Sequence, residues 1–496
     1  MLSVAEIKRL IDEDISSDRK RQAQVGQRYY DAKHDILQTR FFYFNDDGTL
    51  VEDTYRANTK IAHPFFMELA DQIAPYMLSD DENPIRAKKN VEGLQEHLDE
   101  YFDADFWAEI EDLVTGAYIK GFDYLYATKN AENRLCFKCA DGMGVVEVRA
   151  KDTDEKCEYK IYWYIDRIDK GKKQIKRIQV WNDKEVAFFM QSGNGKIVPD
   201  DNIEINPRPH VIYTDKDSGK KKGSSFGFIP FWRMDNNKKQ LSGVHPIKGL
   251  VDDYDLHACS LSNNLVDFDT PLYSVRGYEG NDLNELQLNL KTKKIVGVDS
   301  EGGIDVSTVD IPFQARKEKL NIDRENIYHF GYGLNTSGLK DTAATTNIAI
   351  KSAYTLLDIK AGKLQKRLCK VLKEVVKVVL DEINKAHKTD YQLSDVEFVF
   401  TPNVPTNEKE NAEIEKVKAE TKQIEVNTIL NVAANVGDEQ TLQAICDVMD
   451  YDYEELKGEV EKLKEEQNLE DAKNTLEGLT ADDEQAAEDS SGAIPE

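Results

Sequence analysis

A heptad pattern of apolar residues constrains this chain more than any other feature of its sequence. Pro246 suits the first turn of a helix, and a helix of residues 246–268 would be roughly 34 Å long. Its apolar side chains follow in steps of four and three residues, at Ile247, Val251, Tyr254, Ala258, Leu261, Leu265 and Phe268. Such a stripe is buried best against other helices. Asp252, Asp253 and Asp255 lie off the stripe, which predicts an acidic opposite face.

A second helix is predicted after a short excursion of the chain. Pro312 opens a stretch in which Phe313, Leu320 and Ile327 recur at intervals of seven residues. The excursion itself, residues 270–311, carries alternating strand and helix patterns bounded by turn residues. We therefore expect two helices that bracket a small α/β unit.

The rest of the body mixes helices with short strands. Helical periodicity occurs in residues 3–36 and 60–126, whereas strand patterns occur in residues 159–166, 175–181 and 185–190. Turn-forming sequences separate the three strands, so we expect an antiparallel meander. The predicted fold class is α+β, with helix predominating.

A long helix is predicted in the last third of the chain. Apolar side chains recur at helical spacing from Asn347 to His387, which corresponds to roughly 60 Å of helix, and Gly362 is the expected bend. A strand is expected at 396–402, and further helices at 407–470. A helix this long rarely belongs to one small globule.

Charge is distributed unevenly. The chain carries 65 Lys and Arg against 92 Asp and Glu, for a formal charge of −27, which excludes a general nucleic-acid coat. Residues 471–496 are acidic and lack apolar periodicity, so we expect a disordered acidic tail. The N-terminal segment has helical spacing rather than a signal sequence, and no run of about 18 apolar residues occurs. These features predict an intracellular protein without a membrane span.

Cysteines and short motifs argue against an enzyme. Six cysteines are scattered through the chain, as is typical of reduced thiols. Cys136 and Cys139 could supply half of a zinc site, but tetrahedral zinc needs four ligands and no second CxxC or close HxxxH follows. The patterns GxxxxGK[ST], HExxH and GxSxG are absent as well. We therefore predict no cofactor, no metal and no catalytic residue.

The order of these segments resembles the portal, or head-to-tail connector, protein of tailed bacteriophages with long non-contractile tails. The resemblance is carried by GQRYYDAKHDI (26–36), NTKIAHPFFMELADQIAPYML (58–78), GFDYLYATKN (121–130) and GVHPIKGLVDDYDLHACSLSNNLVDF (243–268). It also includes the glycine-bearing loop before the long helix. One departure is SDDENP (79–84), where members of the family usually have a shorter Gly-Pro turn.

The resemblance implies a ring of twelve copies at one vertex of the capsid, through which double-stranded DNA is packaged and ejected. The implied parts are an N-terminal wing (1–245), a first stem helix (246–269), a clip (270–311), a second stem helix (312–331), a tunnel loop (332–345), a long wing helix and strand (346–406), a crown (407–470) and the acidic tail (471–496). The implied partners are the terminase large subunit, a head-completion adaptor, and the major capsid and scaffolding proteins. The implied location is the virion portal vertex, and the host cytoplasm during assembly.

The resemblance implies that the tunnel loop faces DNA in the channel. Asn335, Thr336 and Ser337 offer neutral hydrogen bonds, and Lys340 beside Asp341 offers one partly compensated positive charge. This chemistry suits transient contact with phosphates. A surface connection that does not contact DNA is the alternative.

Asp252 and Asp255 of the first stem helix could also face the channel. A conduit has to hold a polyanion without gripping it, and rings of carboxylates would repel phosphates within a Debye length of about 8 Å. A solvated helix face explains the same residues. The basic sequences KGKK (170–173) and KDSGKKKG (216–223) could touch nucleic acid or an acidic neighbour, or could be solvated hairpin tips.

Two classes of function therefore remain. One is the portal, and the alternative is a metal-dependent nucleic-acid-processing enzyme built around the CxxC of Cys136 and Cys139. A stoichiometric metal lost with chelation, together with hydrolytic activity, would favour the enzyme.

Overall fold

The chain divides into two compact units, each described here by itself. One comprises residues 1–343 with 349–404, and the other comprises residues 344–348 with 405–496. The computed structural model describes residues 2–54, 56–79, 83–89, 91–130, 134–150, 157–168, 173–214, 221–267, 272–276, 301–307, 312–335, 347–402, 408–449, 453 and 456–458.

The N-terminal third of the first unit is mainly helical. Its helices are α1 (Val4–Ile15), α2 (Asp18–Tyr30), η1 (Asp35–Gln38), α3 (Phe65–Asp71), α4 (Ile73–Met77), α5 (Leu94–Tyr101) and α6 (Ala104–Lys120). Ser3 and Glu6 form a capping box that starts α1, and Asp103 caps α6 by accepting from the backbone of Phe106. Gly121 ends α6 with a φ of 93°, a left-handed conformation that favours glycine.

Small sheets follow these helices. The largest sheet contains the predicted meander, and its strands are β6 (Val145–Arg149), β7 (Cys157–Ile168), β8 (Gln174–Trp181), β9 (Glu185–Ser192), β10 (Val198–Pro199) and β11 (Arg208–Pro209). Two smaller sheets comprise β4 (Phe122–Lys129), β5 (Leu135–Ala140) and β14 (Phe231–Asp235), and β12 (Val211–Thr214) with β13 (Lys221–Ser224). The apolar face of α1 packs on the meander, where Ile7 and Ile11 are buried. The antiparallel pairing of β7, β8 and β9 confirms the meander predicted at 159–190.

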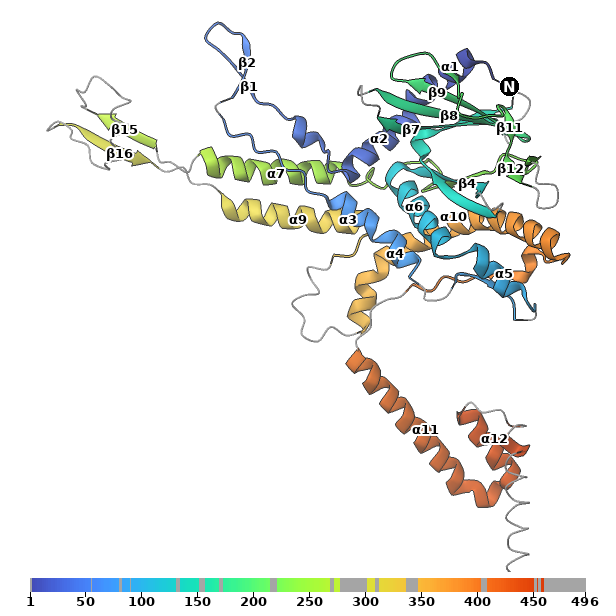
Figure 1. The fold of residues 1–496 in the computed structure, drawn as a ribbon. Helices are drawn as coiled ribbons and strands as arrows, with labels where there is room; N and C mark the ends of the chain where they lie inside the picture. Colours follow the sequence, from blue (N-terminus) through green and yellow to red (C-terminus); the bar gives the residue numbers. More distant parts are fainter. Residues whose placement is uncertain are drawn as a thin grey trace, which may run out of the picture. The chain divides into compact units, whose positions relative to one another are not determined.

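Two helices lie side by side and lead at one end to a small pair of strands (Figure 1). The helices are α7 (Lys248–Asp267) and α9 (Phe313–Gly331), and the strands are β15 (Leu272–Arg276) and β16 (Gly303–Ser307). This confirms both predicted helices and the first and last strands of the excursion. The helix and strand that the sequence predicts between them fall outside the described residues.

The long helix α10 (Asn347–His387) spans the predicted residues and changes direction along its length (Figure 1). Gly362, the predicted bend, has no heavy atom within 4 Å of the place where a Cβ would stand. The apolar side of α10 joins the largest core, together with α3 to α7, α9, β4 and β5. Its long apolar stripe is explained by this packing.

Two predictions about strands and helices need correction. Residues 60–126 are not one helical region, because β3 (Ile85–Ala87) pairs with β17 (Val396–Phe398) and β4 begins at Phe122. The strand expected at 396–402 is also shorter, because β3, its partner strand among the described residues, has three residues. A short hairpin of β1 (Phe42–Phe44) and β2 (Leu50–Glu52) was not predicted.

The second unit contains α11 (Glu408–Val436) and α12 (Asp438–Met449), which pack against each other. Gly437 joins them with a φ of 98°, which favours glycine. The helical prediction for 407–470 is confirmed in these two elements. The expected disordered tail at 471–496 lies outside the described residues.

Candidate functional site

The antiparallel pair of α7 and α9 is held together by polar contacts as well as apolar ones. Lys319 of α9 donates to Asp253 of α7 and to Asp323 one turn further along α9, each at 2.5 Å. The Arg324 guanidinium donates to the Tyr254 hydroxyl at 3.1 Å. Charged contacts at several levels fix the register of the two helices.

A strap, here defined as the extended residues 56–63, runs antiparallel along another face of α7. Four alternate backbone N–H groups of the strap donate to α7 side chains spaced four residues apart. The pairs are Ala57 to Asp267 Oδ1 (2.9 Å), Thr59 to Asn263 Oδ1 (2.6 Å), Ile61 to Cys259 Sγ (3.3 Å) and His63 to Asp255 Oδ1 (3.0 Å). Two residues of extended chain rise about 6.6 Å and four residues of helix about 6.0 Å, so the two repeats match.

Asp255 is the innermost residue of this ladder. Its side chain is 0% exposed, and it accepts from two histidines, His34 Nδ1 at 2.6 Å and His63 Nδ1 at 2.7 Å. Burial alone would raise the pKa of Asp255, but the hydrogen bonds from the two histidines outweigh burial and lower the pKa. The second ring nitrogen of His34 faces the carbonyl of Tyr29 at 3.2 Å. Both ring nitrogens of His34 therefore lie within hydrogen-bond distance of oxygen atoms.

Asp252 lies closer to the surface. It accepts from the Tyr29 hydroxyl and from Lys248 Nζ, the latter at 2.7 Å, and Lys248 also reaches Asp35 at 2.7 Å. Burial would lower the pKa of Lys248, but its hydrogen bonds to the two carboxylates and to Tyr29 raise it. Asp252 thus forms part of a compensated network.

The prediction that Asp255 lies on an exposed acidic face is wrong. The face of α7 that carries Asp255 is covered by the strap, and its short polar side chains satisfy backbone N–H groups of the same chain. The signal was present in the sequence as acceptor side chains at positions 255, 259, 263 and 267. This pattern can be interpreted only once the strap is known to pack on this face of α7.

The chain that leaves α9 is anchored against α3. The side chain of Gln72 accepts from the backbone of Leu334 at 2.9 Å and donates back to its carbonyl at 3.1 Å. A Cβ at Gly333 would stand 1.9 Å from the Leu69 side chain, so any larger residue would force that buried side chain to move. Gly333 therefore permits tight packing of this segment against α3.

The structure describes only the beginning of the predicted tunnel loop. Asn335 is partly buried directly after the anchored Leu334. Thr336, Ser337, Lys340 and Asp341 lie outside the described residues. The site brought together by the structure is therefore the α7–α9 pair with its strap and the anchored start of the loop.

The CxxC lies on a strand, which sets the two thiols apart. Cys136 and Cys139 belong to β5, and side chains three positions apart on a strand point to opposite faces. Burial raises the pKa of both thiols, which disfavours the thiolate that binds zinc. Across the described ranges, no group of three or more His, Cys, Asp or Glu side chains is placed to hold a metal ion.

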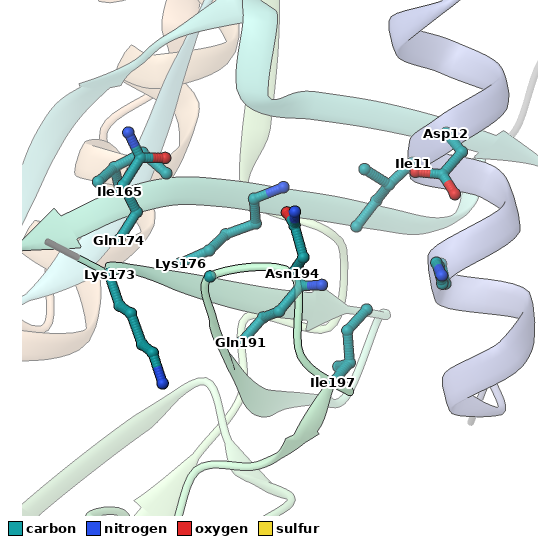
Figure 2. A pocket seen from close by; sticks show the side chains of 11 residues that line it. Ile11, Asp12, Ile165, Lys173, Gln174, Lys176, Gln191, Asn194 and Ile197 are labelled. Carbon is teal, nitrogen blue, oxygen red and sulfur yellow. The ribbon is translucent and has the colours of Figure 1, made fainter. Parts of the chain in front are cut away.

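A cavity of about 550 Å³ lies between α1 and the meander, and Lys173, the last residue of the KGKK sequence, lines it (Figure 2). Lys173 and Lys176 of the meander line it, as do Lys8 and Asp12 of α1. Figure 2 shows Lys176 extending into the hollow near Asn194. The cavity is thus more positively charged than the chain as a whole.

No helix in the described part of the chain combines the length and the apolar character that crossing a membrane requires.

Comparison with known proteins gives consistent results. A family model described as "Phage portal protein, SPP1 Gp6-like" matches residues 10–473. The portal protein of Bacillus phage SPP1 is 22% identical over 345 residues, which cover 69% of this chain and 66%, just under two thirds, of that protein. The portal protein of Clostridium phage phiCD119 is 24% identical over 424 residues, covering 81% of this chain and 87% of that protein.

A solved structure titled "Neck of native GTA particle computed with C12 symmetry" covers 77% of this chain and 89% of its own. Its TM-score is 0.36 at 12% identity, which is too low to support a structural conclusion. The family model, in contrast, spans most of the sequence and includes α7, α9, the strap and the loop between α9 and α10. This chain belongs to the SPP1 Gp6-like family of phage portal proteins.

Proposed function

We propose that this chain is the subunit of a portal ring of twelve copies at one vertex of a phage capsid, and that double-stranded DNA passes through the ring. The family match over residues 10–473 is the observation that carries the proposal. The ring would bind a terminase large subunit, a head-completion adaptor, and the major capsid and scaffolding proteins. Its location is the portal vertex of the virion, reached by assembly in the host cytoplasm.

The proposed parts of the subunit follow the segments expected from the sequence. They are the wing (1–245), the stem helices (246–269 and 312–331), the clip (270–311), the tunnel loop (332–345), the long wing helix and strand (346–406) and the crown (407–470). The α7–α9 pair supports the stem assignment, because two antiparallel helices bracket the β15–β16 strands.

The stem surface suits a conduit that does not retain DNA. Asp253 and Asp252 are each paired with a lysine, Lys319 and Lys248. Paired charges present little net field beyond a few ångströms, so phosphates are neither held strongly nor repelled strongly. Asp252 stays a candidate for the channel-facing position, whereas Asp255 is buried.

The tunnel loop would contact DNA from a fixed starting point. The clamp by Gln72 supports this, since it holds Leu334 while the chain continues toward Asn335, Thr336 and Ser337. Lys340, beside Asp341, would attract passing phosphates weakly. We propose no reaction for the chain, and no observation favours the metal-dependent enzyme.

Negative-stain imaging and native mass spectrometry of the purified chain test the proposal. Rings with a central channel are expected, and the rings should show no DNA-stimulated ATPase activity because GxxxxGK[ST] is absent. Particles that remain monomers or dimers across salt and concentration would contradict the proposal. So would nucleotide turnover that a point change in this chain abolishes.

The role of the loop needs a separate test. Lys340→Asp should lower the length or retention of packaged DNA, with ring assembly and motor docking unchanged. Wild-type DNA content in this variant, and also after replacement of 335–338 by glycines, would remove the loop from the mechanism.

A further inference from the structure

The β1–β2 hairpin exposes aromatic side chains on both of its faces. Its register pairs Phe42 with Glu52, Tyr43 with Val51 and Phe44 with Leu50. We define the aromatic hairpin as the exposed residues Phe42, Tyr43, Phe44 and Leu50, of which Phe44 is 73% exposed. A two-stranded hairpin is marginally stable by itself in water, and each aromatic side chain can bury about 150–250 Å². Burial of these aromatic side chains against a partner surface would therefore stabilise the hairpin.

The hairpin is attached to α7 on both sides. Before it, Asp35 of η1 forms an ion pair with Lys248. After it, the strap begins with the hydrogen bond from Ala57 to Asp267. At its base the Arg56 guanidinium stacks 4.5 Å from the centre of the Phe41 ring. Because both ends are fixed, little conformational freedom is lost when the hairpin meets a partner.

A second exposed apolar surface lies at the end of the helix pair. We define the helix-end patch as Leu265 and Val266 of α7 with Phe313 of α9, each more than half exposed. The Arg316 guanidinium donates to the Asn264 amide oxygen at 2.7 Å, which brings these two helix ends together. Neither this patch nor the aromatic hairpin is covered by the described part of its own chain.

The charges around the two surfaces are opposite. Asp46 and Asp47 form the exposed turn of the aromatic hairpin. Arg316 and Lys317 follow Phe313 on the first turns of α9 and, with Glu318 beside them, leave these turns with a net positive charge. Such complementarity favours association of these two surfaces over association of either surface with itself.

We propose that the aromatic hairpin of one copy of this chain packs on the helix-end patch of the neighbouring copy. The proposal rests on the ring assembly proposed above and assigns the surfaces that form it. Because the two surfaces differ, the contact is head-to-tail, and repetition of a head-to-tail contact closes a ring when the rotation allows. The apolar residues left exposed in one chain are then buried between copies.

Two single variants test this contact by native mass spectrometry over a range of protein concentrations. Phe44→Asp should raise the concentration needed for ring formation by at least about tenfold, as should Phe313→Asp. Ile168→Asp is the matched control, since Ile168 is 67% exposed on the meander, and it should form rings as the wild type does. Circular dichroism melts should be unchanged, because the replaced side chains are exposed.

An equimolar mixture of Phe44→Asp and Phe313→Asp gives a sharper test. The intact hairpin of the Phe313→Asp chain can bind the intact patch of the Phe44→Asp chain, so heterodimers should form and growth should stop there. Rings from Phe44→Asp alone at wild-type concentration, a mixture without heterodimers, or equal loss in the Ile168→Asp control would overturn the proposal. Absence of rings from the wild-type chain would instead defeat the proposed function itself.

Discussion

At the scale of single residues, Asp255 links three parts of the first unit. It joins α7 to the strap through His63 and to the segment after α2 through His34. A buried carboxylate with two histidine donors is favourable only while all partners are present, because removing one leaves uncompensated charge in the interior. Asp255 is therefore a structural centre of the proposed stem.

Asp255→Asn should lower the free energy of unfolding by about 3 kcal/mol at neutral pH. The pKa of Asp255 is lowered in the folded protein from its ordinary 3.8. Stability from the carboxylate is thus fully present above pH 3.8 and is lost as the pH falls through the folded pKa. Urea titrations between pH 5 and pH 2.5 should show that the free energies of unfolding of the wild type and of Asp255→Asn converge as the pH falls. A difference that stays constant to the lowest pH would contradict this assignment.

Gly333→Ala should destabilise the protein by about 1–3 kcal/mol, because the added methyl would stand 1.9 Å from the Leu69 side chain. Gly362→Ala is the matched control. It lies within α10 with open space around the added methyl, and alanine favours helix over glycine by about 1 kcal/mol. Thermal melts should therefore shift in opposite directions. A neutral Gly333→Ala would mean that the start of the loop is not tightly packed.

At the scale of elements, the strap and α7 form an unusual pairing of extended chain with helix. Backbone N–H groups of the strap bond to side chains at every fourth position of α7. Asn263 is buried at the middle of this ladder, whereas its neighbour Asn264 turns toward Arg316 of α9. The two asparagines, adjacent in sequence, therefore hold different elements to α7.

Asn263→Ala should free the Thr59 N–H and speed hydrogen exchange in the strap by about tenfold, with a stability loss of about 1–3 kcal/mol. Exchange in α9 should change little. Asn264→Ala is the control, and it should leave the strap protected because its side chain faces α9. Equal rates of hydrogen exchange in the strap of Asn263→Ala and Asn264→Ala would contradict the hydrogen bonds described between the strap and α7. Mass spectrometry of peptides that cover residues 56–63 provides the measurement.

At the scale of the whole molecule, charge and apolar patterning distinguish the segments suited to contacts between copies from the C-terminal residues 471–496. Residues 471–496 carry eight Asp and Glu against one Lys. They lack the periodic apolar residues that burial in an interface requires. Exposed apolar residues that assembly could bury include those of the β1–β2 hairpin and of the ends of α7 and α9.

A chain that ends at Glu470 should therefore assemble as the full-length chain does. Its formal charge falls from −27 to −20, which reduces repulsion between copies. The measurement is native mass spectrometry of both chains under the same conditions. Loss of rings after truncation would show that the tail takes part in assembly.

The elements with strong periodicity could be predicted from sequence. Residues 246–268, 312–331 and 347–387 were predicted as helices, and all three are confirmed within a few residues. Each stripe is long enough that local pattern and tertiary packing agree. The candidate site was predicted less well, because Asp255 was placed on a surface that the strap covers.

The three long helices, the meander, the excess of negative charge and the family resemblance could all be inferred from the sequence alone, since periodicity, composition and segment order are local or additive properties. Which polar residues are buried, in contrast, depends on the tertiary fold. Asp255 and Asp252 look alike in sequence, yet one is enclosed by His34 and His63 and the other pairs with Lys248 near the surface. Burial depends on which distant segment lies against a helix face, and the strap comes from almost two hundred residues earlier in the chain.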